Sequence, residues 1–235
     1  MSGNVEWLEF PLLMGFPQIK HAVFLRGQGF DLSEKAGLVH QEIALGIIGS
    51  SKGVKLKQRH AADVLALENV TARWTLYDGY DGMITQEKGV ALLVRHADCQ
   101  AALFFDPESG TIANVHCGWR GSIKNIYRET VRKMKDLYGA NPRTIRVCIS
   151  PSLGPTKAEF KHYKKQLPSY FWNYQVTPAH FDFWAISRAQ LFEAGCMQKH
   201  VVCAGMCTYS SPDECFSYRR DPLTGSHGTM IALNG

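Results

Sequence analysis

The chain has 235 residues, a formal net charge of +5 and an isoelectric point near 8.8. Hydrophobic residues make up 45% of it and charged residues 20%, which is typical of a globular protein that buries a core. The positive charges are spread along the chain without a basic stripe, and no apolar run reaches the roughly 20 residues of a membrane-spanning helix. We therefore expect neither a nucleic-acid partner nor a membrane span.

The cysteines and the first sixteen residues bear on the cellular compartment. The cysteine count of seven is odd, and Glu6 and Glu9 stand where a secretory signal would carry lysine or arginine. We therefore expect a cytoplasmic protein with reduced thiols. In such a protein, a cysteine near a histidine indicates metal binding or catalysis before it indicates a disulfide.

The first half of the chain mixes strand and helix patterns. Residues 21–26 are predicted to form a strand, and residues 33–48 a helix with Ser33 as its N-cap. Residues 82–86 and 90–95 are two further predicted strands. The expected buried stripe of the helix consists of Leu38, Val39, Ile43 and Ile47.

The middle of the chain contains a predicted hairpin and the clearest helix. Residues 101–105 and 111–116 are apolar and rich in strand-forming types, and a bridge with proline and glycine joins them. Residues 122–138 are predicted to be helical because their apolar side chains share one face and Gly139 follows.

The last third adds a predicted strand at 145–149 and a predicted helix at 184–194. Three strand-like pieces follow, around Val201, Phe216 and Met230. Strands and helices mix without a strict β-α-β repeat. We therefore predict one α+β domain over residues 1–235, with mixed β-sheets that form a sandwich-like core flanked by helices.

Three side chains at the ends of predicted strands suggest a metal site. Cys99 precedes one arm of the hairpin and His116 ends the other, so an antiparallel pairing brings them side by side. His60, from an earlier loop, would complete a zinc site that leaves a fourth position open for water. Taken singly, a cysteine beside an apolar strand is more often a small buried hydrophobe, so the pattern alone leaves a structural role open.

Several motifs occur in a fixed order along the chain. They are Gln58-Arg59-His60, Ala97-Asp98-Cys99, His116-Cys117-Gly118-Trp119-Arg120-Gly121, Cys207-Thr208, and Phe216-Ser217-Tyr218-Arg219-Arg220-Asp221 with Thr224-Gly225. In this order they resemble the signature of the laccase-domain (YfiH-like) family, once described as multicopper polyphenol oxidoreductases. Bacterial members are also described as peptidoglycan-editing factors. The chain departs from the family pattern at Cys117 and Ser226, where alanine and arginine are usual.

The resemblance implies a cofactor and an activity. The family's zinc ligands correspond to His60, Cys99 and His116. Its members act on purine nucleosides by phosphorolysis of adenosine, inosine or methylthioadenosine, and by deamination of adenosine. The implied ligands of this chain are therefore Zn²⁺, a purine nucleoside and phosphate, and the oligomeric state is left open, a monomer included.

Further residues receive expected roles in that reaction. Arg120 and Arg26 are the expected phosphate-binding residues, because a guanidinium group matches the oxygens of phosphate. Asp81 and Asp98 are expected to act as acid or base or to orient the purine. Trp119 is expected to stack on the purine. For Arg120 a structural ion pair, and for Trp119 packing in the core, are the competing interpretations.

Three other functions compete with this interpretation. A copper polyphenol oxidase is disfavoured, because the nine histidines include no H-x-H pair. A cysteine hydrolase, or a peptidoglycan-precursor editing enzyme, would use Cys99 as nucleophile and His116 as base. A non-catalytic domain stabilised by metal would use Cys203, Cys207 and Cys215 as a second site, but their spacing matches no usual zinc pattern.

Overall fold

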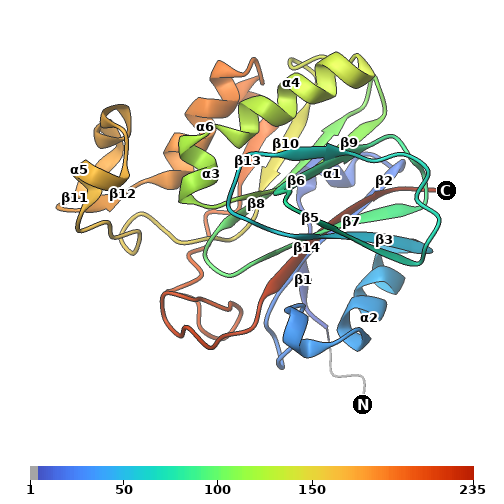
Figure 1. Cartoon of the computed structure of the whole chain (residues 1–235), viewed down its shortest axis with the longest axis horizontal. Coiled ribbons are helices and arrows are strands. Elements are labelled where there is room, and N and C mark those ends of the chain that lie inside the picture. The colour runs from blue at the N-terminus through green and yellow to red at the C-terminus, as the bar shows by residue number, and fades with distance from the viewer. Residues whose placement is uncertain (1–4) are drawn as a thin grey trace.

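Two mixed β-sheets pack face to face in the computed structural model, which describes residues 5–235 (Figure 1). The first sheet contains, in spatial order, β1 (Trp7–Leu8), β2 (Ile19–Phe24), β14 (His227–Leu233), β7 (Val90–His96), β3 (Lys52–Lys57) and β5 (Trp74–Asp78). The second contains β13 (Val201–Cys203), β10 (Arg146–Ile149), β8 (Gln100–Asp106), β9 (Thr111–Cys117), β6 (Gly82–Thr85) and β4 (Val64–Ala66). The predicted α+β class with mixed sheets is confirmed. One domain over residues 1–235 stays a prediction, and residues 1–4 lie outside the described part.

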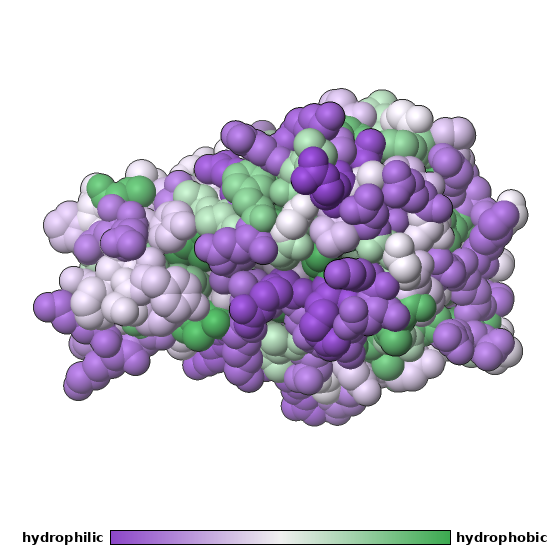
Figure 2. Space-filling view, turned by 90° about the horizontal axis from the view of Figure 1, so that it is seen from above, coloured by the Kyte–Doolittle hydropathy of each residue, from purple (hydrophilic) through white to green (hydrophobic). Residues whose placement is uncertain are grey.

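Six α-helices accompany the sheets in residues 5–235. They are α1 (Pro11–Met14), α2 (Val39–Ile48), α3 (Trp119–Ile123), α4 (Ile126–Tyr138), α5 (Tyr163–Gln166) and α6 (Phe183–Glu193), with 3₁₀ turns at Glu34–Ala36, Ser169–Tyr174 and Gln198–His200. α1 contributes Leu13 to the core between the two sheets. α2 lies on the first sheet, and α3, α4 and α6 lie on the second (Figure 1). α5 and the ribbon of β11 (Gln175–Thr177) and β12 (His180–Phe181) project as a lobe, seen at the left of a mostly hydrophilic face in Figure 2.

Both faces of the central strands are buried. On β8, Leu103 and Phe105 lie in the core between the two sheets, whereas Ala102 and Phe104 pack toward α4. The ring of Phe104 lies 6.1 Å from that of Tyr127 on α4. Strands covered on both faces have continuous apolar runs instead of alternating patterns, which is why the sequence marks β8 and β9 clearly.

The predicted helix over 33–48 begins later than expected. Residues 34–36 form a 3₁₀ turn, Gly37 adopts a positive φ of 73°, and α2 begins only at Val39. Ser33 caps no helix, because its hydroxyl donates to the carboxylate of Asp31 at 2.9 Å. Three members of the expected stripe do not pack: Leu38, Val39 and Ile43 are 56%, 69% and 40% exposed. α2 packs through Ala44, Leu45 and Ile48, with the expected Ile47 partly buried beside them.

Two other predicted elements differ from the structure. The helix over 122–138 is divided at Asn125, whose φ is 54° and whose side chain accepts the Arg128 N–H, so that α4 begins at Ile126. The piece around Phe216 is a loop and forms no strand. The backbone N–H of Phe216 donates to Nε2 of His227 at 2.9 Å. A histidine side chain thus accepts the bond that a neighbouring strand would otherwise accept.

The buried His227 connects the first sheet to this loop. Its Nε2 accepts the N–H of Phe216, and its Nδ1 donates to the carbonyl of Phe24 at 3.1 Å. The neutral ring is therefore fully hydrogen-bonded. Burial lowers the pKa of His227 from the ordinary 6.5 to about 4.

This histidine is expected to make the protein less stable in mild acid. Between pH 6.5 and 4 the unfolded chain binds a proton at this residue that the folded chain does not, so the free energy of unfolding falls as the pH falls. The loss from His227 grows to about 3 kcal/mol near pH 4 and is constant below that. Urea unfolding from pH 7 to pH 4 measures it. His227→Gln should flatten the pH dependence, and His162→Gln, at an exposed position, should not; equal slopes for all three proteins would contradict the assignment.

Candidate active site

A cavity of about 630 Å³ opens between the sandwich and the projecting lobe. This volume lies in the range of pockets that enclose small molecules. Its lining combines imidazole and thiol groups, aromatic rings and guanidinium groups, which come from His60, Cys99, His116, Trp119, Phe160, Phe183, Arg95, Arg120 and Arg219. The cavity can therefore surround a flat, partly apolar molecule that also carries negative charge.

His60, Cys99 and His116 come together at this cavity. His60 lies in the loop after β3, Cys99 in the turn between β7 and β8, and His116 at the end of β9. In the β8–β9 hairpin Ala101 pairs with His116, which places Cys99 just beyond the paired residues. The ligand atoms of the three side chains all lie within 4.8 Å of one another. Among residues 5–235 this is the one such group of metal-ligating side chains, and the cysteines at 203, 207 and 215 form none.

Asp81 bonds both the side chain of His116 and the backbone of the loop that carries His60. Its carboxylate accepts Nδ1–H of His116 at 2.9 Å. It also accepts the backbone N–H groups of Arg59, His60 and Ala61, at 3.1, 2.9 and 2.7 Å. Burial would raise the pKa of Asp81, but His116 and these N–H groups outweigh it and lower the pKa. A buried, ionised carboxylate thus fixes the His60 loop and the ring of His116 together.

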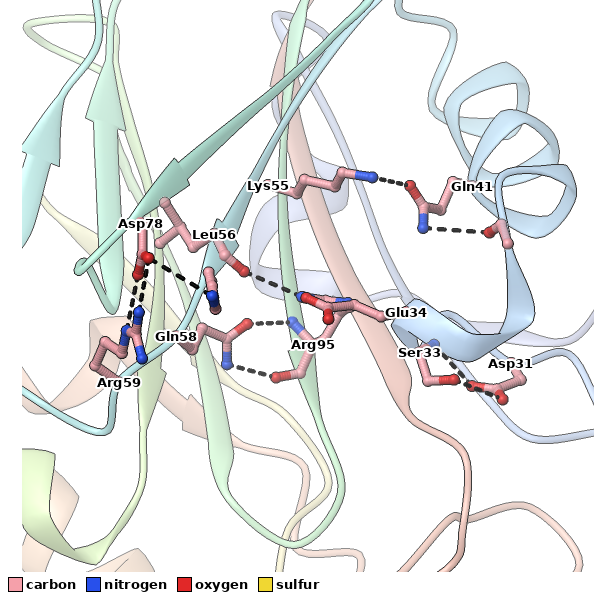
Figure 3. A network of polar contacts seen from close by, with 12 residues as sticks. Asp31, Ser33, Glu34, Gln41, Lys55, Leu56, Gln58, Arg59, Asp78 and Arg95 are labelled. Carbon is pink, nitrogen blue, oxygen red and sulfur yellow. Dashed lines mark hydrogen bonds and ion pairs between the residues drawn. The ribbon is translucent and has the colours of Figure 1, made fainter.

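The loop that carries His60 is also tied to the first sheet (Figure 3). The side-chain Nε2 of Gln58 donates to the backbone carbonyl of Arg95 at 2.7 Å. Its side-chain oxygen accepts the backbone N–H of Arg95 at 3.0 Å. The Arg95 guanidinium donates to Leu56 and pairs with Glu34. Gln58 thereby extends the pairing of β3 with β7 beyond the end of the strand.

The triad suits a zinc ion. Imidazole and thiolate are preferred zinc ligands, and the bond from His116 to Asp81 leaves the other ring nitrogen for a metal. Gly118 leaves the space beside the triad free: a Cβ there would lie 3.0 Å from Cδ2 of His60 and 3.1 Å from Sγ of Cys99. Three protein ligands leave one position for water or substrate, which is the arrangement of catalytic zinc sites.

Cys99 and His116 also change each other's protonation. Burial alone would raise the pKa of Cys99, but His116 and His60 lower it to about 6. Burial works against a charge on His116 as well, yet the Cys99 thiolate and Asp81 raise its pKa to about 9. The thiol is therefore readily deprotonated, as both a metal ligand and a nucleophile require.

Asp81→Asn is expected to weaken metal binding by roughly 10-fold to 100-fold, because the carboxylate that orients His116 and the His60 loop is lost. A zinc-chelator competition titration measures the affinity. Asp78→Asn is the matched control, since Asp78 is half exposed and pairs with Arg59 at the surface. Equal zinc affinity in wild type and Asp81→Asn would contradict the orienting role.

The remaining predicted residues are not all at the cavity. Trp119, Arg120 and Asp98 line it, whereas Asp81 lies beneath the triad and Arg26 is not part of the lining. Arg26 donates to the carbonyl of Pro212 at 2.8 Å and lies over the ring of Phe216. Arg120 lies over the ring of Trp119, with 4.3 Å between its guanidinium carbon and the ring centroid. Trp119 in turn packs edge-on against Phe160.

The structure adds lining residues that the sequence prediction did not include. They are Arg95, Phe160, Phe183, Tyr218, Arg219 and the segment 224–226. Tyr218 and Arg219 belong to the sequence motif at 216–221, so that motif could have indicated them as site residues. Phe160 and Phe183 carry no such signal, because only the fold of the lobe brings them to the cavity.

The fold is an α+β sandwich, and a candidate metal site of three side chains lies beside its central hairpin. A site with three protein ligands and one open position is typical of catalytic zinc centres. The chain belongs to the family described as multi-copper polyphenol oxidoreductase laccase, whose model matches residues 36–234.

Curated relatives carry a more specific name. A purine nucleoside phosphorylase of Bacteroides thetaiotaomicron is 32% identical over 157 residues, which are 63% of this chain and 58% of the relative. Purine nucleoside phosphorylase YlmD of Bacillus subtilis is 28% identical, and the match again covers 58% of the relative. A purine nucleoside phosphorylase of Corynebacterium glutamicum is 27% identical over 93% of this chain and 90% of its own length. The chain thus spans somewhat over half the length of the first two relatives.

Solved structures have the same fold. YlmD from Geobacillus stearothermophilus superposes with a TM-score of 0.84 at 22% identity, covering 100% of this chain and 98% of that one. The hypothetical protein YfiH of Bacillus licheniformis has a TM-score of 0.84 at 18% identity, over 92% and 93% of the two chains. Within residues 5–235, no helix combines the length and apolar character needed to cross a membrane.

Proposed function

We propose that this protein is a zinc-dependent purine nucleoside phosphorylase of the cytoplasm that acts on adenosine, inosine or methylthioadenosine, with adenosine deamination as a second activity. The observation that carries the proposal is the open triad of His60, Cys99 and His116 at a cavity of about 630 Å³. The names of the relatives support the same reaction.

Phosphorolysis forms a bond from phosphate to C1′ of the ribose and breaks the bond from C1′ to the purine nitrogen. It needs an anion held beside the sugar and stabilisation of the departing base. Bound zinc would supply a Lewis acid at the triad. Arg120 lines the cavity and makes no ion pair within residues 5–235, so its guanidinium can bind phosphate.

The rings around the cavity can enclose the purine. Trp119, Phe160 and Phe183 all contribute to the lining, and Phe160 packs against the other two. Aromatic walls bind a flat base and exclude water from its bond to the sugar. In this proposal Asp81, which is fully buried, orients His116.

The test is a zinc assay and a product analysis on one purified sample, incubated with adenosine with and without phosphate. We expect about one zinc per chain, adenine and ribose 1-phosphate when phosphate is present, and some inosine from deamination. A zinc-loaded protein that leaves adenosine, inosine and methylthioadenosine unchanged would contradict the phosphorylase.

A cysteine hydrolase, including a peptidoglycan-precursor editing enzyme, is the second candidate. It is favoured by the lowered pKa of Cys99 next to the raised pKa of His116, which together resemble a nucleophile and its base. A metal-free protein that keeps its activity and loses it on alkylation of Cys99 would support the hydrolase. Activity that disappears with a chelator and returns with zinc would support the phosphorylase.

A further inference from the structure

The chain between 207 and 221 is attached to the site through Asp98. One oxygen of this carboxylate accepts the hydroxyl of the fully buried Thr208 at 2.6 Å, and the other accepts the backbone N–H of Arg219 at 2.6 Å. The carbonyl of Asp98 accepts the N–H of Leu153 at 2.9 Å. Asp98 also has a φ of 88°, a conformation that few residues other than glycine adopt. Three distant segments therefore meet at the residue before Cys99.

The Asp98 carboxylate is engaged by groups of the protein on both of its oxygens. These bonds come from Thr208 and from Arg219, both of which are far from Asp98 in the chain. The same contacts determine where the backbone of Arg219 lies. Asp98 is thus suited to position a neighbouring residue.

The two consecutive arginines next to Asp98 differ in what they contact. Arg220 donates to three carbonyl groups, those of Thr208, Tyr209 and Cys215, and so supports the loop itself. Arg219 lines the cavity and is exposed, and its guanidinium makes only two long contacts, both of 3.3 Å, to the carbonyl of Glu159. Within the described residues it has no carboxylate partner, so most of its five donors are open to a ligand.

We propose that Arg219 is a phosphate-binding residue of the cavity and that Asp98 is the positioning residue that presents it. The proposal rests on the proposed function for the identity of the anion. Arg219 and Arg120 reach the same cavity from different segments, and two guanidinium groups can hold a phosphate dianion from two sides. Hydrogen bonds between a guanidinium group and phosphate depend on the relative orientation of the two groups. The bond from the Arg219 backbone to Asp98 fixes where the Arg219 side chain begins and so favours one orientation.

The test measures binding of inorganic phosphate by isothermal titration calorimetry and the kinetics of inosine phosphorolysis on the same zinc-loaded proteins. Arg219→Ala should weaken phosphate binding at least about 10-fold and raise the KM for phosphate, with the zinc content unchanged. Arg219→Lys should restore part of the affinity. Asp98→Asn keeps the shape and tolerates the positive φ, yet it should weaken phosphate binding in the same direction. It should also speed hydrogen exchange at the Arg219 amide.

Arg132→Ala is the control, because Arg132 is exposed on α4 and pairs there only with Glu129 and Asp136. Unchanged phosphate affinity in Arg219→Ala would overturn the proposal, and unchanged affinity in Asp98→Asn would overturn its positioning part. Wild-type protein that binds no phosphate would overturn it as well. If phosphate binds through Arg219 but no nucleoside is cleaved, the proposed function fails and the anion site stands.

Discussion

Cys99→Ala is expected to remove both the proposed zinc ion and the proposed phosphorolysis activity. Zinc should fall from about one ion per chain to below about one tenth, and kcat/KM for inosine should fall at least about 100-fold. The physical reason is that Cys99 would supply the one thiolate of the proposed three-ligand site, so its loss would leave two imidazoles. Metal analysis and steady-state kinetics on the same sample measure both effects.

Cys203→Ala is the matched control for this variant. Cys203 is a half-buried free cysteine like Cys99, but it lies on the edge strand β13, outside the cavity lining. It should keep its zinc and its activity. If Cys99→Ala retained one zinc and full activity, the triad would not be the metal centre. If it retained zinc but lost activity, Cys99 would act as a nucleophile.

Phe105→Ala is expected to lower the free energy of unfolding by about 3–5 kcal/mol. Phe105 is fully buried between the two sheets, and its ring packs edge-on against Phe16 at 5.1 Å between ring centroids. The cost combines lost burial with a void that the flanking strands cannot close, because their positions are set by hydrogen bonds on both sides. Urea unfolding followed by far-ultraviolet circular dichroism measures it.

Phe192→Ala provides the comparison, because Phe192 on α6 is 37% exposed. Its replacement should cost less than about 1 kcal/mol. A loss of similar size in both variants would show that the core between the sheets is not the main source of stability and would contradict the packing of β8.

The hairpin of β8 and β9 could be predicted because its signals are local. Two apolar runs flank a bridge that contains Pro107 and Gly110, and antiparallel pairing then places Cys99 near His116. The strands β3 and β5 were not predicted. β5 lies at the edge of the first sheet, where Leu76 is 52% exposed. β3 lies between β7 and β5 and carries lysines at positions 52, 55 and 57. Exposed and charged side chains thus interrupt the alternating apolar pattern by which a strand is predicted.

Helix boundaries were the least predictable part of the fold. The apolar residues Leu38, Val39 and Ile43 have helical spacing, yet they face solvent. The face that packs is decided by the approach of α2 to the first sheet. Asn125 similarly divides the helix over 122–138, since its backbone adopts a left-handed conformation that the apolar pattern does not reveal.

The sequence by itself determined the class of fold and the meeting of Cys99 with His116, because both follow from signals within short segments. Only the tertiary structure decided the contacts of Asp81 and Asp98. Asp81 precedes β6, and the pairing of β6 with β9 brings its carboxylate to His116. Asp98 meets Thr208 and Arg219 across more than a hundred residues of chain. Such contacts depend on how sheets and loops pack, and that packing cannot be predicted from the spacing of residues along the chain.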